Sequence, residues 1–346
     1  MKEASRRFLE SLIHAISPSG YEEEAARVWQ TEAKGFADAV RHDVHGNSHA
    51  VINPGGAPRV LLAGHCDEIG FVISHIDDNG FLWIQPIGGW DPQIPQGHRV
   101  VIRSRKGRVP GVIGKMPVHL LKAEERDKVT KLDRLWVDIG ARSRKEAEKR
   151  VAVGDPLVLD HELAELNDRV LAGRGFDNRI GAFIVLEVLR RLAKSKLKAE
   201  VHAVATVQEE IGIRGVRTAA FGIDPQIGIA TDVTFATDHP TMEEAVHRFG
   251  KITLGGGPVL SRGPNVHPRL FERLIETAEK RKIRHQIEAH GGPTPTDANL
   301  LQVSRAGVIT ALVSTPCRYL HSSCELIHLD DVDAEIELLA ETVAGL

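Results

Sequence analysis

Residues 59–68 of the chain read RVLLAGHCDE, and this stretch contains the strand on which the fold depends. The run from Val60 to Gly64 has no polar residue, which is typical of a strand buried inside a sheet. His65 and Asp67 follow directly. In α/β sheets, ligands bind outside the carboxyl ends of the strands. The stretch therefore predicts a buried strand that leads into a functional site.

Strand and helix patterns alternate through much of the remaining chain. The first 30 residues predict two helices separated by a turn at Ser17–Gly20. Further strands are expected at residues 39–44, 49–53, 200–207, 226–230 and 308–313, and further helices at residues 178–194, 213–221, 268–281 and 331–343. This alternation predicts an α/β fold with a mixed central sheet and helices on both faces.

Residues 70–159 show a different sequence pattern from the rest of the chain. Asp78-Asn79-Gly80 separates two apolar runs, and Lys106-Gly107 separates two more, so each pair predicts a β-hairpin. Ser143 and Glu146 have the spacing of a capping box that opens one short helix. We interpret residues 70–159 as a small, β-barrel-like domain inserted into a larger α/β domain made of residues 1–69 and 160–346.

Composition excludes several classes of protein. The chain has 346 residues, too many for one ordinary core, and its formal net charge of −3 gives no sign of a nucleic-acid or membrane partner. No apolar run approaches the roughly 18 residues of a membrane span. Only three cysteines are present, and no CxxC occurs. This sparse, odd set favours a reducing compartment, and we expect a cytoplasmic protein.

Ionisable residues gather where the predicted strands end. Asp177 opens a predicted helix, and the others follow strands; the full set is His65, Asp67, Asp177, Glu209, Glu210, Asp232 and His321. Carboxylates clustered at one rim of a sheet would repel one another unless cations compensated them. Divalent metals supply that charge, and mixed imidazole and carboxylate ligands favour zinc or cobalt over calcium or magnesium.

Two histidines can serve two metals, one each, and a bridging carboxylate would hold such a pair roughly 3.5–4 Å apart. Glu209 and Glu210 are adjacent, so one can bind metal while the other stays free as a base. His65 and Asp67 are two positions apart and face the same way along a strand. Asp67 can therefore orient the imidazole of His65.

Each residue also has a structural interpretation. Asp177 could simply cap a helix, Asp232 could belong to a turn, and His321 could be a core histidine. The double glutamate could be a solvated acidic pair. Cys66 should point to the opposite strand face from His65 and is not expected to be a nucleophile. The glycines at 255–257 lack the following Lys-Ser/Thr of a phosphate-binding loop.

Taken together, these motifs resemble those of the TET-type metallo-aminopeptidases, which include glutamyl and leucyl aminopeptidases. The resemblance covers nearly the whole chain and is carried, in order, by Ser19-Gly20-Tyr21-Glu22, Asp43-Val44-His45-Gly46-Asn47, Gly64–Gly70, Gly175–Gly181, Gln208–Gly212, Thr231-Asp232-Val233 and Arg318–Ser322.

The resemblance implies a role for each site residue. One metal is expected on His65 and Asp232 and a second on Glu210 and His321, with Asp177 bridging them. Glu209 is implied as the general base for a bridging water activated by the two divalent metals, and Asp67 as the residue that tunes His65. The activity implied is removal of N-terminal residues from short peptides. The inserted β domain is implied to mediate dimerisation, and the dimers are implied to assemble into a homododecamer.

One segment departs from the family pattern. Members usually have Gly-Gly followed directly by Thr-Asp-Ala, whereas residues 291–298 here read GGPTPTDA. The preferred N-terminal residue therefore stays open. Two other functions also stay open on the metal site alone: a binuclear carboxypeptidase or N-acyl-amino-acid deacylase, and a scaffold that keeps the fold without turnover. The scaffold would predict a missing base or ligand, and none is missing.

Overall fold

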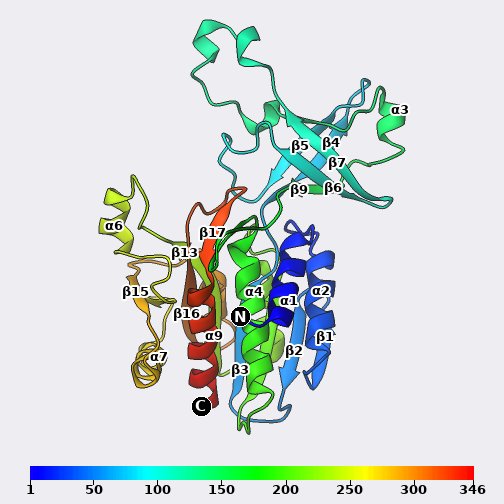
Figure 1. Ribbon diagram of the computed structural model, residues 1–346. Helices are drawn as coiled ribbons and strands as arrows, with labels where there is room; N and C mark the ends of the chain where they lie inside the picture. The colour runs from blue at the N-terminus through cyan, green and yellow to red at the C-terminus, as the bar shows by residue number, and fades with distance from the viewer.

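The computed structural model describes all 346 residues, and a mixed eight-stranded sheet lies at the centre of its larger part (Figure 1). The strand order is β1-β2-β12-β3-β13-β16-β14-β15. The bounds are β1 Ala39–His42, β2 Ser48–Ile52, β3 Arg59–His65, β12 Glu200–Thr206, β13 Ile227–Phe235, β14 Val259–Arg262, β15 Gln286–Ala289 and β16 Ile309–Cys317. The four central strands β12, β3, β13 and β16 run parallel, so their carboxyl ends meet at one edge.

Helices cover both faces of this sheet, as predicted. One face carries α1 (Glu3–His14), α2 (Glu23–Ala33), α4 (Phe176–Leu192), α7 (Pro268–Arg281) and α9 (Leu329–Ala344), and the other carries α5 (Arg214–Ile223) and α8 (Asp297–Leu301). Strand β3 shows why. Its Val60 and Leu62 join the first core, whereas Leu61 and Ala63 join the second. Alternate side chains of one buried strand thus supply both layers.

A closed six-stranded barrel stands beyond the carboxyl edge of the sheet (Figure 1). Its strands are β4 (Gly70–Ile76), β5 (Leu82–Ile87), β6 (Arg99–Ser104), β7 (Gly107–Gly114), β8 (Trp136–Asp138) and β9 (Pro156–Leu159). Both predicted hairpins are confirmed, because β4 pairs with β5 and β6 with β7, each antiparallel. The barrel encloses a core of 16 buried residues separate from the two cores of the sheet.

Short elements complete the chain. They are the helices α3 (Arg144–Ala147) and α6 (Glu243–Phe249), three 3₁₀ turns at Val118–Leu120, Ala123–Glu125 and Leu132–Arg134, and a small sheet of β10 (Ala164–Asn167), β11 (Val170–Gly173) and β17 (Glu325–His328). Ser143 caps α3 as predicted, by accepting from the amide of Glu146. None of the helices is long and apolar enough to cross a membrane.

Two strands extend further than their apolar runs. The pattern predicted a strand at 226–230, but β13 continues to Phe235 and pairs with β16 as far as Cys317. Polar residues such as Thr231 end the hydrophobic run, yet the backbone ladder continues through them. Asp232 consequently lies inside β13 rather than in a turn after a strand, which corrects its expected position.

Candidate metal centre

His65 is the last residue of β3, and its side chain is almost fully buried. Its Nδ1 lies 3.2 Å from the backbone oxygen of Asp67 and 3.4 Å from the Asp67 carboxylate. Both oxygens can only accept, so Nδ1 carries the proton and donates it. The Nε2 lone pair therefore faces the site, which is the tautomer that metal binding requires.

Asp67 also fixes the double glutamate. One of its carboxylate oxygens accepts from the amide of Glu209 and the other from the amide of Glu210, each at 3.1 Å. Ser19 donates to the same carboxylate at 2.5 Å. One fully buried side chain thus joins the end of β3, the segment after β12 and the N-terminal turn.

Asp177 lies at an irregular start of α4. The φ/ψ angles of Asp177 and Asn178 are not helical, and the Oδ1 of Asn178 accepts from the amide of Gly181 at 3.0 Å. Asn178, not Asp177, therefore caps the regular helix. The Asp177 carboxylate is free to face the site, where one oxygen lies 3.2 Å from Nε2 of His65 and the other 3.2 Å from Nε2 of His321.

Close packing brings this helix to the strand. A Cβ atom added at Gly64 would lie only 2.4 Å from the backbone of Gly181. No side chain larger than hydrogen fits between β3 and α4 at this level. The backbone contact is what places Asp177 beside His65.

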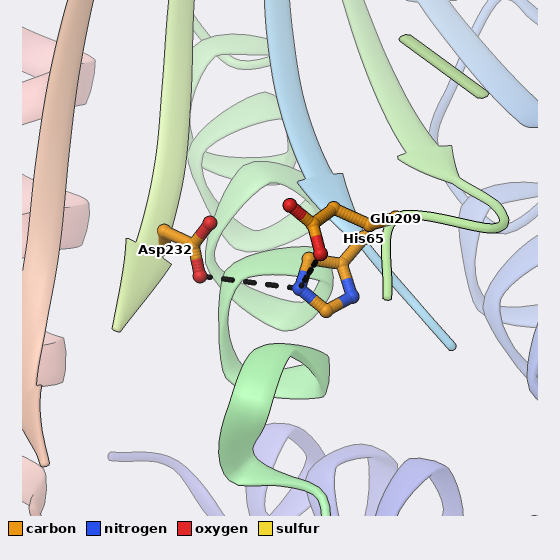
Figure 2. A group of neighbouring side chains, drawn as sticks. All are labelled: His65, Glu209 and Asp232. Atoms are coloured by element: carbon orange, nitrogen blue, oxygen red, sulfur yellow. Dashed lines mark ion pairs between the residues drawn. The ribbon is translucent and has the colours of Figure 1, made fainter. Parts of the chain in front are cut away.

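Asp232 projects from β13 toward the same point. Figure 2 shows that its carboxylate and that of Glu209 both face the Nε2 atom of His65. That nitrogen lies 3.9 Å from the Asp232 carboxylate and 3.7 Å from the Glu209 carboxylate.

His321 comes from the loop after β16, where its φ of 57° places it in the left-handed region. Its Nδ1 lies 2.8 Å from the carbonyl oxygen of Gly89, in the connection between β5 and β6. The carbonyl can only accept, so Nε2 is again the free nitrogen. That atom lies 3.4 Å from the Glu210 carboxylate.

The side chains form two clusters with ligand atoms within 4.8 Å of one another: His65, Glu209 and Asp232 in one, and Asp177, Glu210 and His321 in the other. Asp177 lies between the clusters, since its two oxygens face the two histidines. The structure thus brings all six of these predicted residues to one place, with Asp67 directly behind His65.

Burial and crowding shift the protonation of these groups strongly. Burial raises the pKa of Glu209 to about 10 and that of Asp232 to about 8, and burial together with the charge of Asp177 raises that of Glu210. Burial works to lower the pKa of His321, but the hydrogen bond to Asp177 and the charge of Glu210 raise it to about 10. Carboxylates this close therefore need protons or cations to coexist.

Two atoms of the clustered side chains are buried and have no hydrogen-bond partner. They are Nε2 of His65 and Oε1 of Glu210. Unpaired buried polar atoms are costly and call for a partner. Imidazole nitrogens and carboxylate oxygens that converge without partners fit a divalent metal, which would displace the protons that they otherwise share.

Comparison with known proteins identifies the family. The sequence profile of the M42 glutamyl aminopeptidases matches residues 46–338. The chain belongs to this family. The M42 chain is 39% identical over 334 residues to a lysyl aminopeptidase of Pyrococcus furiosus, covering 95% of this chain and 94% of the relative. Members of the M42 family are metallopeptidases, so the protein is a metal-dependent aminopeptidase. This confirms the resemblance to metallo-aminopeptidases that the sequence motifs indicated.

Solved structures agree. A TET aminopeptidase from a marine sediment archaeon of the Thaumarchaeota is 35% identical, with a TM-score of 0.94 over 99% of this chain and 97% of its own. The TET1 peptidase of Pyrococcus horikoshii, which can assemble into a tetrahedron or a large octahedral shell, is 32% identical. Its TM-score is 0.88 over 99% of this chain and 100% of its own.

Two residues beside the centre of this M42 peptidase escaped prediction. The first is Glu325 on β17, whose two carboxylate oxygens accept from the amide of Asp177 at 3.0 Å and from the amide of His321 at 3.1 Å. Burial raises its pKa to about 8. Its only sequence signal was its position four residues after His321.

Asp297, at the start of α8, is the second, and its charge acts on Glu209 and Asp232 without a hydrogen bond to either. It is almost fully buried, accepts from Thr206 at 2.6 Å, and burial raises its pKa to about 6. The segment that departs from the family pattern leads directly into it. The signal that could have found Asp297 was the Thr-Asp-Ala at the end of that segment.

The centre of the peptidase opens into a cavity of about 730 Å³. All six clustered residues line it. Residues 293–296 line it too, so the departing segment forms part of its wall. This segment is held by hydrogen bonds, because Thr294 contacts both Asn265 and Thr296. Cys66 is buried and does not line the cavity, in agreement with its expected structural role.

Proposed function

We propose that the peptidase removes N-terminal residues from short peptides with two divalent metal ions per chain. His65 and Asp232 would hold one ion, Glu210 and His321 the other, and Asp177 would bridge them. The observation that carries this proposal is the position of Asp177, with one oxygen 3.2 Å from each histidine Nε2. The mixed nitrogen and oxygen ligands favour zinc or cobalt.

When bound, the ions would polarise the scissile carbonyl and lower the pKa of a water molecule between them. We propose Glu209 as the base that takes a proton from this water and delivers it to the leaving amine. Glu209 lies beside His65, but it would not be needed as a metal ligand if Asp177 bridged the two ions. Its buried carboxyl, whose pKa is raised to about 10 before any cation binds, has a strong affinity for a proton.

The charge of the centre favours a free N-terminus in the substrate. Four carboxylates and two histidines form the two clusters, and Asp67 adds a fifth carboxylate 3.4 Å from His65. Two divalent ions would carry four positive charges, so at least one negative charge would remain. A peptide's α-ammonium can compensate it, whereas the neutral amide of an acylated substrate cannot. This supports an aminopeptidase over a deacylase or a carboxypeptidase.

For the assembly, we propose that the barrel mediates dimerisation and that dimers build a homododecamer in the cytoplasm. The tetrahedral assembly of the Pyrococcus horikoshii TET1 peptidase, similar over nearly the whole of both chains, supports the larger particle. The three cysteines are all free, which fits a reducing compartment.

Metal reconstitution tests the two-ion proposal. Metal-free protein titrated with zinc or cobalt should take up two ions per chain, and activity should require both. Asp177→Asn should lose metal while staying folded, since an amide is a poor bridge. Elemental analysis after dialysis measures the ratio. A retained ratio of two in this variant would show that Asp177 does not bridge.

A further inference from the structure

The cavity continues beyond the metal-binding clusters, and a buried acidic residue lies in its far wall. Glu288, on strand β15, lines the cavity although only 2% of its surface is exposed. Its Oε2 accepts from the Oγ1 of Thr234 at 2.8 Å. Thr234 follows Asp232 by two positions in β13, so both side chains lie on one face of that strand. Thr234 lies one strand step, about 7 Å, beyond the predicted metal ligand Asp232, and Glu288 contacts Thr234 from β15.

The charge of Glu288 has no strong partner within the chain. Its one ion-pairing neighbour is the Nε2 of His290 at 3.5 Å, and that nitrogen makes no hydrogen bond. The Oε1 of Glu288 makes none either.

Glu68 is a buried carboxylate whose charge the chain itself compensates. Glu68 is as buried as Glu288, but Arg174 and Arg179 contact it at 2.5 and 2.6 Å. A buried carboxylate without such a cation is costly unless a ligand provides one. Glu288 lines an open cavity, so a ligand can reach it.

Arg248 also lines the cavity, and its positive charge would favour an acidic side chain in the substrate. Arg248 belongs to α6, is exposed, and stacks on the ring of Phe249 at 4.8 Å. Solvent screens an exposed charge far more than a buried one. The buried carboxylate therefore outweighs the arginine at the rim in selecting a side chain.

We propose that this part of the cavity receives the side chain of the substrate's N-terminal residue, and that Glu288 selects lysine or arginine there. The proposal rests on the aminopeptidase reaction at the metal centre. An extended lysine side chain spans about 6 Å from Cα to Nζ, which matches the strand step between Asp232 and Thr234. Its ammonium would meet the free oxygen of Glu288, and its methylenes would pack against the cavity wall.

The test compares lysine with norleucine, which has the same four side-chain carbons but lacks the ammonium. Two peptides that differ only in this N-terminal residue are assayed with metal-loaded enzyme. The wild type should show a kcat/KM at least about tenfold higher for the lysine peptide, the value expected for one charge-assisted hydrogen bond. Glu288→Gln should lower that ratio about tenfold or more. Thr234→Val should lower it by less, and the matched control Glu276→Gln, an exposed glutamate on α7, should not change it.

Each other outcome has a distinct meaning. Equal rates for the two peptides, or a preference for an N-terminal glutamate peptide, would overturn the selection by Glu288 and leave the aminopeptidase reaction standing. The wild-type comparison alone decides this point even where a variant fails to fold. An unchanged lysine preference in folded Glu288→Gln would assign the selection to another residue. Cleavage of N-acetylated peptides alone would overturn both proposals.

Discussion

The Nδ1 atom of His321 lies 2.8 Å from the carbonyl oxygen of Gly89, and this contact links the barrel region to the metal centre. It sets the tautomer of a predicted metal ligand through a residue more than 200 positions away in the sequence. The inserted region is therefore part of the site and not only an appendage for assembly.

Removal of residues 70–159 should affect both assembly and turnover. Phe71 pairs with Leu157, so the chain enters and leaves the barrel at adjacent points and a short linker can close the gap. The shortened protein should form smaller particles in light scattering. It should also lose activity, because His321 loses its carbonyl partner. A particle of unchanged size would place the main subunit contacts elsewhere.

Glu209→Gln should keep both metals and lose most of its turnover. Loss of a general base typically lowers the rate about 10²–10⁴-fold. Metal content and kcat are measured on the same preparation. Near-normal kcat in a fully metallated variant would show that a different residue is the base.

Glu325→Gln should weaken metal binding and activity together, by about 10–100-fold, as is typical for residues that orient ligands. A glutamine has one acceptor oxygen, so it can hold the amide of Asp177 or that of His321, but not both. Glu335→Gln is the matched control, since Glu335 is equally buried but accepts from Thr315. Equal metal affinity in the two variants would contradict a positioning role for Glu325.

Asp43 should contribute stability that depends on pH. Burial acts to raise its pKa, but the contacts with His49 and Asn47 lower it below the ordinary value. A carboxylate whose pKa is depressed by folding stabilises the protein above its unfolded pKa, near 3.9, and loses that contribution as the pH falls. Asp43→Asn should therefore cost about 1 kcal/mol at pH 7 and somewhat less at pH 3, because the contribution is fully lost only below the depressed folded pKa. Urea unfolding of the metal-free proteins measures both values, and a deficit that does not shrink at pH 3 would argue against this origin.

The sequence predicted the six clustered residues because most of them follow a buried apolar run or open a helix. The sequence could not predict which neighbouring side chains orient these residues. Glu325 reaches Asp177 only because β17 packs beside the start of α4, and a pairing between residues 148 positions apart leaves no local pattern. Asp232 was misplaced by a few residues because polar side chains facing a site interrupt the hydrophobic run without ending the strand. The barrel was visible from its hairpins, whereas its contact with His321 was not.

The most direct test of the proposed reaction compares one peptide with and without an N-acetyl cap, at equal metal loading. The negative charge that remains at the centre should favour the free α-ammonium by at least about tenfold in kcat/KM. Mass spectrometry should then show a ladder of products shortened from the N-terminus, and only for the uncapped peptide. Preferred cleavage of the capped peptide, or shortening from the C-terminus, would contradict removal of N-terminal residues at this centre.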